Sequence, residues 1–220
     1  MINIAIYGPA GAVKSTIARK AASELGFIYI DTGALYRTVG VAAMRENKLG
    51  SDSEIESVLT DELSVELRFS DGIQKMYLNG EDVSEAIRTP EASMAASKVS
   101  AVPAVRAYLF DLQKRIAKEN NCLMDGRDIG TVVLPDADVK IFLTASPEAR
   151  AKRRYKELVE KGSDVKYEDV LSDMIKRDYD DSHRAIAPLK QAEDAILVDT
   201  SDIGLEESIA LIIRTIKENI

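Results

Sequence analysis

The stretch YGPAGAVKST, residues 7–16, decides which fold this sequence can form. It follows the pattern G-x-x-x-x-G-K-[ST], in which backbone N–H groups just ahead of a helix point at phosphate oxygens. The pattern opens at Gly8 and closes with residues 14–16, but Val13 stands where the second fixed glycine belongs. The sequence therefore predicts a phosphate loop with one departure from the pattern.

The members of this loop have separate predicted roles. Lys14 would reach the β- and γ-phosphates of a nucleotide, and the Ser15 hydroxyl would ligate Mg²⁺. The position before the lysine often has a positive φ, where a β-branched residue such as Val13 carries strain of about 1–3 kcal/mol. We therefore expect an impaired loop. The residues predicted to bind the phosphates of ATP are Gly8, Pro9, Ala10, Gly11, Ala12, Val13, Lys14, Ser15 and Thr16.

The segments around the loop supply the context that the motif requires. Ile17, Ala21 and Leu25 recur at a spacing of four, which predicts a helix with one apolar face, and Gly26 is suited to end it. Alternation of apolar runs with helical stretches indicates an α/β fold, a parallel sheet of about five strands flanked by helices. The predicted strands lie at residues 2–7, 27–31, 122–125, 139–145 and 195–200.

The segment 63–83 interrupts this alternation. Apolar and charged residues alternate in it, and Asp71-Gly72 and Asn79-Gly80 are hairpin-turn signals. We predict a small antiparallel, three-stranded insert over about residues 63–97. Two interpretations stay open, an insert that determines specificity and one that is structural ornament.

Composition limits the classes of function. The chain has 220 residues, 45% of them hydrophobic and 30% charged, which fits one domain with a substantial core. Its net charge of -8 argues against nonspecific binding to nucleic acid or to an anionic membrane. Because no apolar run nears the ~20 residues of a membrane span and the start resembles no secretion signal, we expect a cytoplasmic protein. Cys122, the single cysteine, is expected to be a buried thiol.

Residues 146–148, Ser-Pro-Glu, predict the start of a helix. Five basic residues follow within seven positions, and either a solvated face or a lid closing over polyphosphate explains them. We assign the lid to about residues 146–184 and the core to about 1–62, 98–145 and 185–220. The basic residues are Arg150, Lys152, Arg153, Arg154 and Lys156.

Charged residues follow the predicted strands. Asp125, which ends one strand, is suited either to supporting Mg²⁺ through water or to an ordinary cap or turn. Arg37 and Arg127 follow the carboxyl ends of strands, where open α/β sheets bind ligands. Several arginines at such positions in an acidic chain favour a phosphate site. The stretch KRDYDDSHRAIAPL, residues 176–189, adds Arg177, Asp181 and Arg184.

Together these stretches resemble the bacterial cytidylate kinases, a family of nucleoside-monophosphate kinases with a phosphate loop. The resemblance runs in order from residue 8 to residue 189, and the family's nucleotide-binding insert corresponds to the 63–83 segment. The matching stretches are GPAGAVKST (8–16), DTGALYR (31–37), GEDVSEAIRTPE (80–91), ASKVSAVPAVR (96–106), DGRDIGTVV (125–133) and RDYDDSHRAIAPL (177–189).

The resemblance implies how the acceptor, CMP or dCMP, is bound. The family's cytosine-reading residues correspond to Ser97, Arg106 and Asp128. A carboxylate accepts from the cytosine amino group and an arginine donates to its N3 or O2, so uracil would leave buried groups unpaired at a cost of roughly 1–3 kcal/mol each. The remaining contacts correspond to Arg37, Arg127 and Arg184 for the phosphate, Asp181 and Arg177 for the ribose, and Thr32 and Tyr36 beside the acceptor.

The implied reaction converts ATP and CMP to ADP and CDP with Mg²⁺. Lys14, Arg127, Arg150 and Arg154 are the predicted catalytic residues, which neutralise charge on the moving phosphoryl group. Ser15 and, through water, Asp125 are the predicted metal residues. We expect a monomer whose partners are small molecules. A nucleotide-binding protein with little turnover, or a kinase for another small acceptor, remains an alternative because of Val13.

Overall fold

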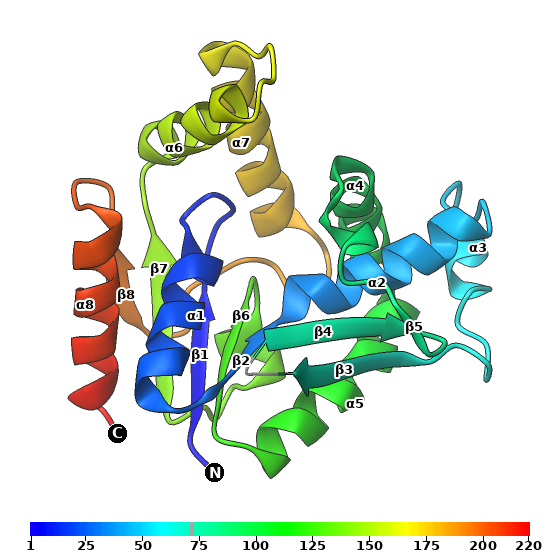
Figure 1. Cartoon of the computed structure of the whole chain (residues 1–220), viewed down its shortest axis with the longest axis horizontal. Helices are drawn as coiled ribbons and strands as arrows, with labels where there is room; N and C mark the ends of the chain where they lie inside the picture. Colours follow the sequence, from blue (N-terminus) through cyan, green and yellow to red (C-terminus); the bar gives the residue numbers. More distant parts are fainter. Residues whose placement is uncertain (71–72) are drawn as a thin grey trace. The chain divides into compact units, whose positions relative to one another are not determined.

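The computed structural model describes residues 1–70 and 73–220 (Figure 1). The chain forms two compact units. Unit 1 consists of Met1–Tyr29 and Asn120–Ile220, and unit 2 consists of Ile30–Glu119. Within the described part of the chain, no helix has the length and apolar character that spanning a bilayer requires.

A five-stranded parallel sheet forms the centre of unit 1, as predicted. Its strand order is β2-β6-β1-β7-β8. Tyr7 at the end of β1 is in register with Gly126 of β6 and with Phe142 of β7, so the loops after these strands begin at one edge. The five strands, each close to a predicted one, are β1 (Asn3–Tyr7), β2 (Ile28–Asp31), β6 (Cys122–Gly126), β7 (Val139–Thr144) and β8 (Ile196–Asp199).

Two helices cover one face of this sheet with apolar side chains. In α1 (Lys14–Leu25), Ile17 and Ala21 pack into the same cluster as Ile4 and Ile6 of β1, and α8 (Leu205–Lys217) contributes its own isoleucines. The helix α1 ends at Gly26 in the left-handed conformation, as its sequence predicts. Cys122 is buried, and its burial raises the pKa of the thiol to about 12, so the thiol is inert at neutral pH.

Two helices that pack against each other follow β7. The first, α6 (Pro147–Glu160), begins as predicted, because the Ser146 hydroxyl accepts a hydrogen bond from the Ala149 N–H at 3.2 Å. The second, α7 (Tyr167–His183), ends just before Arg184. The π-helical turn η2 (Ile129–Val133) follows β6.

The three-stranded antiparallel insert predicted for the 63–83 segment is present in unit 2. Asn79 and Gly80 join β4 to β5 with φ of 51° and 83°, the two positive values that a two-residue hairpin turn requires. The other predicted turn, Asp71-Gly72, lies outside the described residues. The elements of unit 2 are α2 (Thr32–Arg45), α3 (Asp52–Glu56), β3 (Val65–Ser70), β4 (Ile73–Leu78), β5 (Glu81–Asp82), η1 (Ala86–Arg88), α4 (Pro90–Val99) and α5 (Pro103–Glu119).

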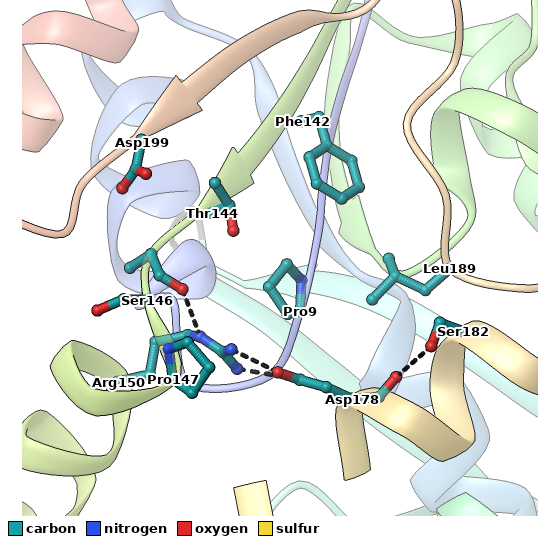
Figure 2. A pocket seen from close by; sticks show the side chains of 11 residues that line it. Pro9, Phe142, Thr144, Ser146, Pro147, Arg150, Asp178, Ser182, Leu189 and Asp199 are labelled. Carbon is teal, nitrogen blue, oxygen red and sulfur yellow. Dashed lines mark hydrogen bonds and ion pairs between the residues drawn. The ribbon is translucent and has the colours of Figure 1, made fainter. Parts of the chain in front are cut away.

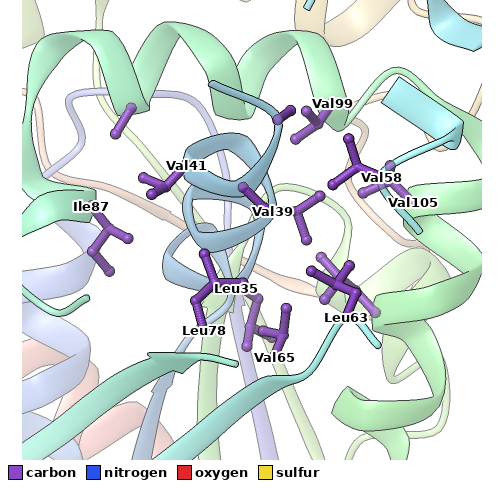
Figure 3. Packing of buried hydrophobic residues seen from close by; sticks show 14 of the residues in the cluster. Leu35, Val39, Val41, Val58, Leu63, Val65, Leu78, Ile87, Val99 and Val105 are labelled. Carbon is purple, nitrogen blue, oxygen red and sulfur yellow. The ribbon is translucent and has the colours of Figure 1, made fainter. Parts of the chain in front are cut away.

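The core of unit 2 lies around α2 (Figure 3). Leu35 and Val39, four residues apart on that helix, are fully buried. Gly40 brings α2 close to α4, because a Cβ at Gly40 would lie 3.0 Å from the Cβ of Ala95. This packing fixes the helices that carry several predicted acceptor residues.

Candidate active site

The backbone of the phosphate loop is held in the left-handed region at several positions. A Cβ at Gly8, where φ is 152°, would lie 2.1 Å from the carbonyl oxygen of Leu143, so only glycine fits there. Gly11 has φ of 75° and Val13 has φ of 56°. The prediction that Val13 lies at positive φ is therefore confirmed. Its carbonyl oxygen accepts from the N–H groups of Thr16 and Ile17 at 3.2 Å, which starts α1.

The side chain of Val13 has a partner. It is partly buried and packs against the apolar cluster between the sheet and α1. The same side chain therefore anchors the loop to unit 1. Val13 combines an unfavourable backbone conformation with a favourable apolar contact.

Lys14 is 5% exposed, and its ammonium donates a hydrogen bond to the carbonyl oxygen of Pro9 at 2.6 Å. Burial away from water is the main cause that lowers the pKa of Lys14 to about 7; Arg127 lowers it further, while Asp125 and Asp181 oppose the shift. The predicted residues from three separate stretches therefore act on one ammonium group. Ser15 and Thr16, which follow it, are exposed at the start of α1.

Asp125, predicted to support Mg²⁺, lies near the end of β6 and is 4% exposed. The hydroxyl of Tyr29 donates to its carboxylate at 3.2 Å. Tyr29 was not predicted, because it is 96 residues from Asp125 and no local pattern joins the two. A carboxylate and the Ser15 hydroxyl fit Mg²⁺, which takes few protein oxygens and otherwise binds water and substrate phosphate.

Two ion pairs join the segment after β6 to the end of α7. The Arg127 Nε donates to the Asp181 carboxylate at 3.1 Å, and the Arg184 Nη2 lies 3.5 Å from the Asp128 Oδ1. Asp128 is 5% exposed, and the Arg184 guanidinium supplies an opposite charge beside it. Arg177 is exposed on α7. Four predicted acceptor residues are thus paired within unit 1.

The other predicted acceptor residues lie in unit 2. Arg37 donates to the Asp31 carboxylate at 2.7 Å, and the same carboxylate caps α2 by accepting from the Ala34 N–H at 3.1 Å. Asp31 was not predicted, although an aspartate directly before a helix is a common cap. Thr32 is the buried first residue of α2, and Ser97 is exposed on α4. The Arg106 guanidinium lies 5.8 Å from the ring centroid of Tyr36.

The basic residues of α6 do not form one solvated face. Arg150 is 2% exposed, and it binds the backbone of the phosphate loop and Asp178 rather than facing outward. Arg153 donates to the carbonyl oxygen of Thr200. Arg154 is half-exposed and pairs with Glu157 at 2.8 Å. Asp178, the partner of Arg150, was not predicted because the two are 28 residues apart.

A pocket of about 370 Å³ lies beside the loop in unit 1 (Figure 2). Pro9 forms part of its wall, and the paired side chains of Arg150 and Asp178 lie at one side of it. Phe142 and Leu189 add apolar surface. The pocket therefore reaches the phosphate loop from the side of α6 and α7.

Comparison with known proteins finds relatives along nearly the whole chain. A family model described as cytidylate kinase matches residues 4–218. The cytidylate kinase of Thermosipho melanesiensis is 52% identical over 215 residues, with 98% of this chain and 96% of that protein covered. The cytidylate kinase of Carboxydothermus hydrogenoformans is 50% identical over 215 residues, with 98% and 97% covered.

Solved structures show the same fold at low identity. The shikimate kinase of Bacteroides thetaiotaomicron superposes with a TM-score of 0.51 at 11% identity, with 99% of this chain and 96% of that chain covered. An uncharacterized protein from Eubacterium ventriosum gives a TM-score of 0.51 at 13% identity, with 99% of each chain covered. At such identity these likenesses concern the fold alone.

Proposed function

This chain belongs to the cytidylate kinase family, and we infer from that membership that it transfers the γ-phosphoryl group of ATP to CMP, giving ADP and CDP. One observation within the site carries this conclusion. The phosphate loop keeps its left-handed positions and its buried lysine although Val13 replaces a glycine of the motif. We propose that dCMP is a second acceptor.

We propose that the donor phosphates bind over the loop, where Lys14 and the backbone N–H groups ahead of α1 face them. Ser15 and, through water, Asp125 are the residues suited to hold Mg²⁺, which would neutralise phosphate charge. Phosphoryl transfer needs in-line positioning and positive charge more than covalent chemistry. Arg127 and Arg154 are the side chains that we propose supply further positive charge. Arg150, also predicted for this role, is bound to the loop backbone and to Asp178, so we propose that its charge acts from that position.

We propose that CMP is recognised by the residues that the family resemblance assigns. Asp128 would accept from the cytosine amino group, with Arg106 and Ser97 as donors. The CMP phosphate is already an anion and can attack without a general base. The phosphate would be held by Arg37, Arg127 and Arg184, the ribose by Asp181 and Arg177, and Thr32 and Tyr36 would flank the acceptor.

The test is a coupled assay of ADP release with each nucleoside monophosphate as acceptor. We expect CMP and dCMP to be the best acceptors, with CMP modestly better because Asp181 can bond a 2′-hydroxyl. UMP should be far weaker. If ATP binds but CMP gives no turnover, the chain is a nucleotide-binding protein; if UMP or AMP is the best acceptor, the assigned base contacts are wrong.

A further inference from the structure

The guanidinium of Arg150 joins the phosphate loop to both helices that follow β7. Its Nη1 donates to the carbonyl oxygen of Ala10 at 2.9 Å and to the Asp178 carboxylate at 3.0 Å. Its Nε donates to the carbonyl oxygen of Ala145 at 2.7 Å, and Nη2 donates to the second oxygen of Asp178. Figure 2 shows the paired side chains between α6 and α7. Four of the five N–H groups of Arg150 therefore donate to backbone oxygens and one carboxylate.

The bond to Ala10 sets the direction of a peptide group in the loop. In a planar trans peptide, the C=O and the N–H of the next residue point in opposite directions. A carbonyl of Ala10 that points at Arg150 therefore turns the N–H of Gly11 away from Arg150. In a phosphate loop such N–H groups bind the phosphate oxygens, so the orientation of this peptide matters for the donor nucleotide.

Asp178 keeps the guanidinium in place. Arg150 is 2% exposed, and a buried cation needs a compensating charge and hydrogen bonds. The Asp178 side chain is 24% exposed and binds the guanidinium through both of its oxygens. Without its charge, Arg150 would lose its compensation and would be expected to leave the Ala10 carbonyl for water.

A second contact links α7 to the same peptide. Met174, one turn before Asp178 on α7, is 8% exposed, and a Cβ at Gly11 would lie 2.9 Å from its Cε. The same Cβ would lie 3.3 Å from the Cβ of Arg150. Gly11 therefore allows both helices to contact the loop closely. The helix α7 acts on the Ala10–Gly11 peptide directly through Met174 and indirectly through Asp178 and Arg150.

We propose that Asp178 is a positioning residue for the donor site, acting through Arg150 to fix the Ala10–Gly11 peptide of the phosphate loop. This rests on the proposed function only in that the donor is a nucleoside triphosphate. Asp178 touches no reacting group in this account. It sets the affinity of the loop for donor phosphates and leaves recognition of the acceptor unchanged.

The experiment compares Asp178→Asn with Asp173→Asn, a matched loss of charge at an exposed position of the same helix. Binding of ATP carrying a fluorescent ribose substituent is titrated without acceptor, and KM values for ATP and for CMP are measured. Because a charge-assisted contact is weakened, Asp178→Asn should raise the dissociation constant and the KM for ATP about tenfold, and the KM for CMP less than about twofold. Asp178→Glu should restore most of the loss, and Asp173→Asn should match the parent chain.

A double variant separates positioning from general destabilisation. If Asp178 acts through Arg150, adding Asp178→Asn to Arg150→Lys should change ATP affinity little further, because the bidentate contact is already lost. The proposal is overturned if Asp178→Asn leaves ATP affinity unchanged, if ATP and CMP constants rise equally, or if the two substitutions add. If Asp178→Asn does not fold, Arg150→Lys takes its place, because it breaks the same bidentate contact and should likewise raise the KM for ATP more than the KM for CMP. The binding titration stays decisive even if the parent chain does not phosphorylate CMP.

Discussion

Val13 carries two opposing energies in one residue. Its φ of 56° lies where a β-branched side chain is strained, at a cost of about 1–3 kcal/mol. Its side chain is partly buried against the apolar cluster of unit 1, which offsets part of that cost. Val13 thus keeps a positive φ, and the strain lies within the predicted donor site.

We predict that Val13→Gly raises kcat/KM for ATP. Relief of about 1–3 kcal/mol corresponds to roughly 5- to 150-fold if it appears fully in binding or in the transition state. Relief of strain raises the free energy of unfolding, whereas glycine loses the apolar contact and adds chain entropy to the unfolded state. Because these effects oppose each other, the free energy of unfolding should change little. Steady-state kinetics with ATP varied at saturating CMP, and then with CMP varied, test this. Equal ATP parameters in the two chains would show that Val13 is accommodated without functional cost.

We predict that Lys14 makes donor binding dependent on pH. With a pKa lowered to about 7, its side chain is mostly neutral in the free protein at higher pH. Bound polyphosphate favours the ammonium and raises that pKa. Binding of ATP at about pH 8 should therefore take up close to one proton, and affinity should fall by up to about tenfold for each further pH unit.

Titration calorimetry in two buffers of different ionisation enthalpy measures this proton uptake. The phosphate groups of ATP titrate near pH ~6 and add little at the higher pH. Lys14→Arg is the matched control, because a guanidinium stays protonated and should show no uptake. Equal binding enthalpies for the parent chain in both buffers would contradict the prediction.

At the level of elements, periodicity and turn chemistry predict most of what forms. The strand–loop–helix unit at the start, the five strands of the sheet and the Asn79-Gly80 turn can be predicted locally, because each leaves an apolar pattern or a turn signal within a few residues. The pairs Arg150–Asp178 and Tyr29–Asp125 join residues far apart in the chain. A single sequence contains no local signal for such pairs.

The crossing of α2 and α4 depends on Gly40. In Gly40→Ala the new Cβ would lie 3.0 Å from the Cβ of Ala95 and 3.1 Å from the backbone nitrogen of Ala96, so α4 must shift. Overpacking lowers the free energy of unfolding by about 1–3 kcal/mol, whereas replacing a helical glycine by alanine raises it by about 1 kcal/mol. We predict a lower free energy of unfolding and a KM for CMP that rises more than the KM for ATP, because α2 carries Tyr36 and Arg37.

Denaturant unfolding and the two KM values check this prediction. Gly204→Ala is the control, since a Cβ at Gly204, the residue before α8, meets no atom within 4 Å. If Gly40→Ala unfolds like the parent chain and keeps its KM for CMP, then α2 and α4 adapt without moving the predicted acceptor residues.

Across the whole molecule, the predicted site residues are divided between the two units. All of the predicted donor and metal residues belong to unit 1, whereas the predicted CMP residues fall partly in each unit. Within each unit the structure shows several of them in pairs or stacks, such as Arg127–Asp181 and Arg106–Tyr36. The sequence order predicts which residues belong to the site. It does not predict these pairings, because they depend on how distant segments pack.

The residues predicted to select the acceptor base come from both units, Asp128 from unit 1 and Ser97 and Arg106 from unit 2. Asp128 is 5% exposed and its carboxylate lies 3.5 Å from the Arg184 guanidinium, so its substitution affects this ion pair as well as the proposed base contact. In Asp128→Asn the amide can still accept from cytosine, but its NH₂ group can also donate to the O4 of uracil. We predict that the ratio of kcat/KM for CMP to that for UMP falls by roughly tenfold or more, equivalent to ~1.4 kcal/mol.

This ratio separates base selection from the weaker phosphate contact expected when Arg184 loses its charged partner, because that loss is common to both acceptors. Asp136→Asn, an equal change of charge at an exposed position eight residues along the same segment, should keep the ratio of the parent chain. Kinetics of the three chains with both acceptors decide the matter, and an unchanged ratio in Asp128→Asn would remove Asp128 from the base-binding residues.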